Sequence, residues 1–247
     1  MRRLPLRFLV VADEPEPCPY LPGRQMRLPL RMPTARLRPE DFDALLYDGD
    51  RRSGPLVYRP ACDGCAACEA LRVPVQRFRP TRSQRRVWRR NDAEVRVERH
   101  RPAATPDHVR LYNRHARERG LSLKSEPSTP SEYQFFLVDT CVDTWELRYF
   151  VGDVMVAVSV LDYGRESVSS VYHYFDPDHA WRSLGVYSVL KEIELCAASG
   201  VEWYYLGLYV SECEHLNYKA AYYPHQRRVG DRWYEYASEG AEPVCVD

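Results

Sequence analysis

Residues 172–194, YHYFDPDHAWRSLGVYSVLKEIE, run from the end of a predicted strand through a turn into a predicted helix. The strand covers residues 167–175. In the helix, residues 186–199, apolar residues recur at helical spacing, with Leu190, Ile193 and Ala197 on one face. Gly200 ends the helix. This strand–turn–helix unit lies in the middle of the second half of the sequence.

Two further strands precede the unit, at residues 146–151 and 154–162. They are separated from each other and from the third strand by Gly152-Asp153 and Gly164-Arg165, which predicts an antiparallel meander. After the helix, residues 201–210 form a buried strand, residues 211–224 a second helix closed by Pro224, and residues 232–237 a last strand. This order is typical of the acetyltransferase (GNAT) fold, so we expect an α+β protein with a mixed sheet flanked by helices.

In that fold, the turn at Arg182-Ser183-Leu184-Gly185-Val186-Tyr187 would hold a coenzyme A pyrophosphate on backbone N–H groups. Tyr187 replaces the small residue expected at the last position. A phenol ring there would crowd a pyrophosphate but could stack on a base or ribose.

The first half is proline-punctuated and basic. Residues 1–120 carry 26 Arg and 15 Asp or Glu, whereas the remaining residues carry nine basic and 20 acidic side chains. Residues 81–91, TRSQRRVWRRN, predict a helix with one basic face suited to nucleic-acid phosphates, although a solvated surface helix has the same pattern. The residues of this candidate nucleic-acid-binding face, which becomes a tRNA-binding face under the family resemblance given below, are Arg82, Arg85, Arg86, Arg89 and Arg90. The composition predicts an N-terminal domain over residues 1–105 with the cysteines and the basic helix, followed by a GNAT-like transferase domain over residues 106–240.

Cysteines cluster at Cys62-x-x-Cys65-x-x-Cys68, with Cys18 upstream. Four thiols in tight turns suit a structural zinc ion or an iron–sulfur cluster, and the alternative is that they are plain small residues. The apolar run at the N-terminus is too short for a secretory signal or a membrane span, so we expect a cytoplasmic protein with no membrane partner.

Several blocks together resemble the arginyl-tRNA–protein transferase family. They include CPYLPGRQMRLPL, RRSGPLVYRPACDGCAACEALRVPV and YLGLYVSECEHLNYKAAYYP, and they are collinear over most of residues 18–236. The similarity is greatest to the bacterial branch, which transfers leucine. Two positions depart from the family pattern: Leu21 stands where eukaryotic relatives have a second cysteine, and no aromatic residue directly precedes Arg51-Arg52-Ser53-Gly54.

The resemblance implies transfer of Leu from charged tRNA to the α-amine of proteins that begin with Asp or Glu, which marks them for degradation in the N-degron pathway. Partners would be aminoacyl-tRNA and those acceptor proteins; the oligomeric state is not predicted. The ester is already activated, and the amine has a pKa of about 8, so no cofactor is required for the chemistry. Arginine as the donated residue, a coenzyme A-dependent N-acetyltransferase and a metal-dependent nucleic-acid-binding module are the alternatives.

Candidate site residues follow from these patterns and from the resemblance. The acceptor carboxylate needs a cation, which Arg51, Arg52, Arg59 or Lys219 would supply, and Asp176 or Glu192 would act as general base. The candidate catalytic residues are Asp176, Glu192, Tyr218 and Lys219. The candidate substrate-binding residues are Arg51, Arg52, Ser53, Tyr58, Arg59, Tyr172, Ser183, Gly185, Tyr187 and Tyr209.

Overall fold

The computed structural model describes residues 7–121 and 126–246. In this part of the chain, nine strands form one mixed sheet in the order β15-β14-β13-β7-β12-β11-β10-β9-β8. The strands are β7 (Glu69–Pro74), β8 (Val95–His100), β9 (Asp143–Val151), β10 (Val154–Tyr163), β11 (Ser167–Phe175), β12 (Trp203–Tyr209), β13 (His225–Val229), β14 (Arg232–Tyr236) and β15 (Val244–Cys245). The expected α+β fold, with a large mixed sheet flanked by helices, is confirmed.

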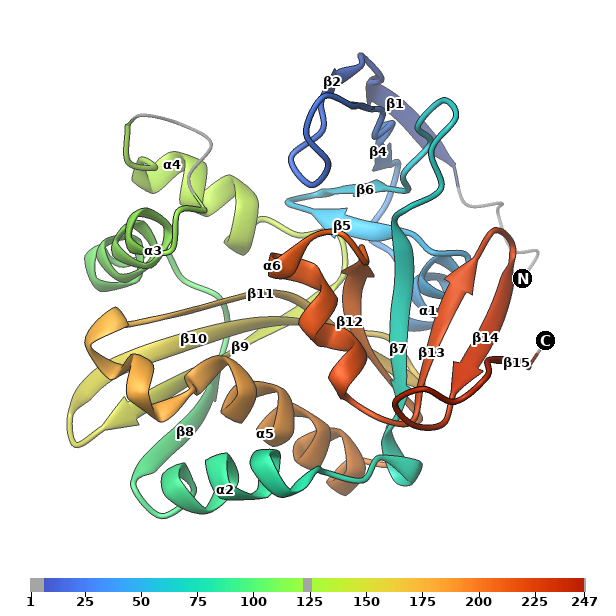
Figure 1. Cartoon of the computed structure of the whole chain (residues 1–247). Helices are drawn as coiled ribbons and strands as arrows, with labels where there is room; N and C mark the ends of the chain where they lie inside the picture. Colours follow the sequence, from blue (N-terminus) through green and yellow to red (C-terminus); the bar gives the residue numbers. More distant parts are fainter. Residues whose placement is uncertain (1–6, 122–125, 247) are drawn as a thin grey trace, which may run out of the picture.

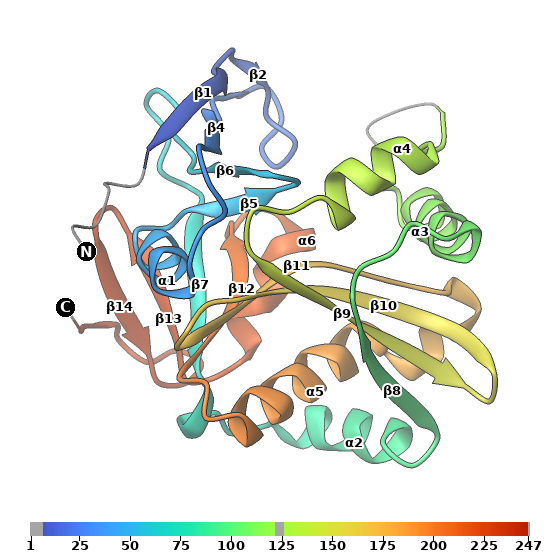
Figure 2. The ribbon, with the colours of Figure 1, turned by 180° about the vertical axis from the view of Figure 1, so that it is seen from behind.

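The predicted meander is β9, β10 and β11, paired antiparallel in sequence order. Helix α5 (Leu184–Ala198) begins two residues before the predicted helix and ends one residue before its predicted end. It packs with α2 (Arg82–Asn91) against one face of the sheet (Figures 1 and 2). A capping box starts α2, because the Thr81 and Gln84 side chains each bond to the other's backbone N–H.

The opposite face is covered in two places. Helix α3 (Pro106–Glu118), the single turn α4 (Pro130–Tyr133) and the π-helix Gln134–Val138 lie over β10 and β11. A small second sheet has the order β1 (Phe8–Ala12), β4 (Leu30–Pro33), β6 (Leu56–Tyr58) and β5 (Arg51–Ser53). It lies on the β7 and β12 side together with α1 (Pro39–Tyr47), while β2 (Glu16–Pro17) and β3 (Gln25–Met26) form a separate hairpin (Figure 2).

The predicted second helix at residues 211–224 was wrong in extent. The structure has only one α-turn, α6 (Glu214–Asn217), continued by the 3₁₀ turn Tyr218–Ala221. The Lys219 side chain turns inward at this point, and its Nζ donates to the Leu208 carbonyl at 2.6 Å. This tertiary contact replaces the continued helix that was expected up to Pro224.

The predicted boundary at residue 105 remains a prediction. Strands β7 and β8, both from the first hundred residues, belong to the same sheet as the meander. Strand β7 pairs with β12 on one side and with β13 on the other. The first and second halves of the sequence are therefore joined through the middle of the sheet.

Candidate functional site

The two central parallel strands separate into a fork. Strands β11 and β12 pair only between Ser167–Ser169 and Trp203–Tyr205, although β11 continues to Phe175 and β12 to Tyr209. Beyond the pairing, the carboxyl ends of the two strands diverge and leave backbone groups for other partners. In α/β sheets, ligands bind outside the carboxyl ends of strands at such a topological break.

Arg51 fills the start of the fork. Strand β5 delivers its guanidinium, which donates from Nη1 to Ser169 Oγ at 2.9 Å and from Nη2 to the Ser170 carbonyl at 2.6 Å. The side chain is buried, and this burial lowers the pKa of Arg51. Tyr58 of β6 lies close enough for the Arg51 charge to oppose the rise that burial causes in the tyrosine's pKa.

Lys219 approaches the same place from the 3₁₀ turn Tyr218–Ala221. Burial lowers its pKa to about 7, and the neighbouring positive charge of Arg51 acts in the same direction. Gly207 makes the approach possible, since a Cβ there would lie 3.0 Å from Arg51 Nη2 and 3.5 Å from Lys219 Nζ. Its φ of +94° is also a conformation that favours glycine.

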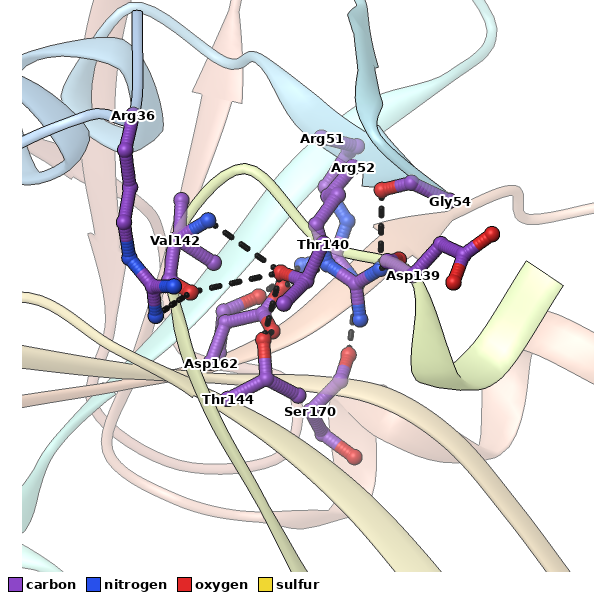
Figure 3. Close-up of polar contacts among 11 residues, drawn as sticks. Arg36, Arg51, Arg52, Gly54, Asp139, Thr140, Val142, Thr144, Asp162 and Ser170 are labelled. Atoms are coloured by element: carbon purple, nitrogen blue, oxygen red, sulfur yellow. Dashed lines mark hydrogen bonds and ion pairs between the residues drawn. The ribbon is translucent and has the colours of Figure 1, made fainter. Parts of the chain in front are cut away.

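Arg52, the next residue, points elsewhere. Its Nε donates to Asp162 Oδ2 at 2.6 Å, and both side chains are fully buried (Figure 3). Arg52 Nη1 also bonds the carbonyls of Gly54 and Asp139, and Asp162 Oδ1 accepts from Thr144. Arg52 is therefore paired and holds β5 and the segment before β9 against β10, rather than facing the fork.

Glu192 lies beneath the fork, on the inner face of α5. It is 1% exposed and accepts hydrogen bonds from the hydroxyls of Tyr204 and Tyr149. Burial raises its pKa to about 7, although the surrounding hydroxyls oppose the shift. The Ser159 hydroxyl extends this buried network, because it donates to the Tyr149 hydroxyl and lies 2.8 Å from His173 Nδ1. A carboxyl group with this pKa exchanges a proton readily at neutral pH.

Asp176, the other candidate base, has a structural role in the described structure. Its carboxylate caps the 3₁₀ turn Pro177–Arg182 by accepting from the Asp178 N–H at 3.0 Å. Arg114 of α3 pairs with the same oxygen at 2.8 Å. Both contacts tie the Asp176 carboxylate to the turn and to α3.

The turn before α5 leads into Tyr187, whose side chain packs inward. Tyr187 is fully buried, its ring packs against Trp88 and Tyr149, and its hydroxyl donates to Asp92 at 3.3 Å. This packing engages both the ring and the hydroxyl of Tyr187, and its assignment to substrate binding stays a prediction. Ser183 is left-handed, with φ 56°, and Gly185 approaches His173 in the first turn of α5.

The remaining substrate-binding candidates are dispersed. Arg59 pairs with Asp50 at 2.7 Å. Tyr172 packs among Tyr112, Phe136 and Tyr174 beside α3. Ser53 ends β5, and the ring of Tyr209 lies under the Arg227 guanidinium.

The Tyr218 residue is 49% exposed, yet burial of its hydroxyl raises its pKa, and the Glu192 charge adds to the rise. This residue therefore lies between solvent and the buried carboxyl group. Arg82, Arg85, Arg86, Arg89 and Arg90 are all exposed on α2, as the basic-face prediction requires.

The predicted cysteine ligands lie near one another. Cys18, Cys65 and Cys68 pack beside Cys213, and Cys62 bonds the Arg27 backbone. Within residues 7–121 and 126–246, no group of three or more His, Cys, Asp or Glu side chains is arranged to hold a metal ion. The metal site at Cys18, Cys62, Cys65 and Cys68 stays a prediction, and no reaction step is assigned to it.

Sequence reasoning missed several residues of the fork, namely Ser169, Ser170, Tyr204 and Gly207. Only Gly207 carried a usable signal, because an isolated glycine inside a strand indicates close approach of another group. The serines and Tyr204 are ordinary strand residues until the divergence of β11 and β12 gives them partners.

Comparison with known proteins adds independent findings. Family models described as arginine-tRNA-protein transferase match residues 16–86 (N terminus) and residues 107–229 (C terminus). An aspartate/glutamate leucyltransferase of Aeromonas hydrophila is 36% identical over 217 residues, 87% of this chain and 90% of that protein. One from Chromobacterium violaceum is 35% identical over 222 residues, 90% and 91% of the two chains.

Among solved structures, FemX aligns with a TM-score of 0.46 and 10% identity, over 82% of this chain and 79% of FemX. A likeness at this level supports no conclusion about function.

Proposed function

This chain belongs to the arginine-tRNA–protein transferase family, and on that premise we propose that it transfers leucine from charged tRNA to proteins beginning with Asp or Glu. The resemblance noted in the sequence blocks is confirmed. The relatives at 35–36% identity are leucyltransferases, which supports leucine rather than arginine as the donated residue. Addition of leucine would mark the acceptor for degradation.

The fork carries this proposal, because it joins both parts of the family match at one place. Arg51 comes from the part matched by residues 16–86, whereas Lys219 and the diverging strands belong to residues 107–229. Neither part alone would supply both of these basic side chains at the fork between β11 and β12. An acidic acceptor requires such a site.

The proposed chemistry is aminolysis. The acceptor's α-amine nitrogen attacks the ester carbonyl carbon, the bond from that carbon to the terminal ribose oxygen breaks, and an amide forms. The amine loses a proton, and the ribose oxygen gains one. Glu192, with a pKa raised to about 7 and hydroxyl contacts to Tyr204 and Tyr149, is proposed as the proton acceptor. Tyr218 lies at the solvent side of this network.

The tRNA is assigned to α2. Its five arginines are exposed, and the helix is fixed to α5 by apolar packing, so it presents a rigid basic surface. No described helix is both long and apolar enough to cross a bilayer. We place the reaction in the cytoplasm, where charged tRNA is made.

We also infer an acetyltransferase-like (GNAT) fold for the second part of the chain. The sequence of meander, α5, β12 and α6 supports an acetyltransferase-like arrangement for residues 106–240. In this proposal, residues 1–105 form the region that carries the cysteines and the basic helix.

The test is incubation of purified protein with leucyl-tRNA and arginyl-tRNA together and a peptide that begins with Asp. Mass analysis of the peptide should show added leucine. A peptide with an acetylated N-terminus is the control and should remain unchanged, because it has no free amine. Added arginine would reassign the donor, and addition of neither residue would refute the proposal.

A further inference from the structure

We propose that a pocket between α5 and the edge strand β8 binds a small aliphatic carboxylate, with the Arg99 guanidinium as its anion-binding group. The pocket is separate from the fork, because β10 and β9 lie between β11 and β8 in the sheet. A ligand bound there would contact none of the fork residues described above. Such a site would exist whether or not the protein transfers leucine.

The pocket is small and enclosed by secondary structure. Its volume is about 270 Å³, and its lining comes from β8, β9, β10, α5 and the segments that flank β8 and α5. Sites for drug-sized ligands have volumes of roughly 300–1,000 Å³. The pocket therefore suits a smaller molecule with a short carbon chain.

The walls of the pocket are mainly apolar. They are formed by Val95, Val97, Leu147, Leu195 and Val201. Leu195 is 38% exposed, although it belongs to the helix that covers the core. Removing this apolar surface from water would favour binding of a hydrocarbon chain.

Arg99 provides the polar end of the pocket. Its Cζ lies 4.0 Å from the ring centroid of Trp145 and 4.7 Å from that of Tyr163, so two aromatic rings hold the guanidinium in place. Within residues 7–121 and 126–246, no carboxylate lies within ion-pair distance of this guanidinium. A carboxylate can accept two parallel hydrogen bonds from such a group.

The other polar lining groups do not compete with an anion. Lys191 Nζ pairs with Asp92 at 2.9 Å and with Glu194 at 2.8 Å. Burial raises the pKa of Tyr163 to about 12 and also raises the pKa of the Cys196 thiol, so both groups are neutral at pH 7. Among the described lining residues, Arg99 is thus the charged group without an ionic partner, and its sign selects an anion.

The first test uses the unaltered protein and three probes of similar size. Isothermal titration calorimetry should show that hexanoate binds roughly 10- to 100-fold more tightly than hexanamide, as expected for hydrogen bonds to a charged partner. Hexylamine should not bind, because its ammonium would face Arg99. Equal affinity for the acid and the amide, or no binding of hexanoate, would overturn the proposal.

Arg99→Gln tests the anion-binding group, and Arg96→Gln is the matched control. Both arginines are exposed residues of β8, but alternate side chains of a strand point to opposite faces. Arg96 stacks on Phe150 and pairs with Glu98. Hexanoate affinity should fall roughly 10-fold or more in Arg99→Gln. It should stay at the wild-type value in Arg96→Gln. Equal losses in the two variants would show an effect of net charge and would overturn the proposal.

A second measurement locates the ligand without altering the protein. An aliphatic carboxylate with a diazirine in its chain loses nitrogen on irradiation, and the resulting carbene inserts into a neighbouring bond. Peptide mapping should place the label in residues 95–99 or 191–201, and excess hexanoate should suppress it. A label only in other segments, or one that hexanoate does not suppress, would overturn the proposal.

Discussion

Glu192 binds its proton more tightly in the folded protein than a free glutamate side chain does. It lies in the core beneath the fork, with a pKa raised from 4.5 to about 7 by burial. The folded protein therefore holds a proton at Glu192 between these values, whereas the unfolded chain has lost it. Stability from this group is present below pH 4.5 and declines as pH rises toward 7.

A Glu192→Gln variant should lack this decline. The difference in free energy of unfolding, wild type minus variant, should fall by about 3 kcal/mol at most as pH rises from 5 to 7.5. Urea unfolding of both proteins at each pH measures it, and the subtraction cancels the contributions of the histidines. A difference that is constant with pH would show that Glu192 titrates normally.

Arg52 offers a second prediction, about stability rather than substrate. Replacing it with Met leaves Asp162 buried without its partner, at a cost of roughly 3–5 kcal/mol. Equilibrium unfolding in urea at pH 7 measures the loss. The double variant Arg52→Met with Asp162→Leu should recover most of it, because no unpaired charge then remains. Equal losses in the single and double variants would contradict the pairing.

The same residues show how far the sequence could identify the site. The sequence assigned both Arg51 and Arg52 to substrate, but only the structure distinguishes them. The Arg52 side chain bonds to Asp162, which lies 110 positions away in the chain. The Arg51 side chain bonds to serine residues at a similar separation in sequence. Such partners follow from strand order and register, which a single sequence does not specify.

Among the elements, α2 provides a prediction about tRNA. Substituting Arg82, Arg86 and Arg89 with Gln should weaken binding of leucyl-tRNA and leave the KM for the peptide unchanged. The plot of log affinity against log salt should become shallower by about two to three units, because each phosphate contact contributes somewhat less than one. Binding measured between low and moderate salt gives the slope.

A second triple variant controls for total charge. Arg110, Arg117 and Arg165 are exposed arginines on other elements, with side chains 73%, 76% and 68% accessible. Their change to Gln should leave the salt slope as in the wild type. A slope reduced equally by both variants would show that binding depends on net charge and not on α2.

The sequence predicted well those elements that have clear turn residues, helix caps or a periodic apolar face. The meander has glycine turns, α2 has its capping box and α5 has an apolar face ended by Gly200. The small sheet β1-β4-β6-β5 has short strands with little alternation. The helix expected after β12 was shortened by the inward turn of Lys219. The small sheet and the shortened helix depend on tertiary contacts, which local sequence patterns do not contain.

At the scale of the whole molecule, the position of β7 predicts cooperative unfolding. This strand is hydrogen-bonded between β12 and β13, so removing residues 1–105 would split the sheet. We expect a single unfolding transition for the full chain, seen alike by fluorescence and by circular dichroism. A fragment of residues 106–247 should not fold alone. Two separate transitions would contradict this and would support division of the chain near residue 105.

The place of β7 also has a consequence for synthesis in the cell. Its residues leave the ribosome well before those of either neighbouring strand, since β12 and β13 come from the last quarter of the sequence. Until then, β7 has two open edges, and the Arg51 guanidinium has no serine partners. The nascent chain therefore cannot complete its central sheet before translation is almost finished, and an interrupted product lacks a working fork.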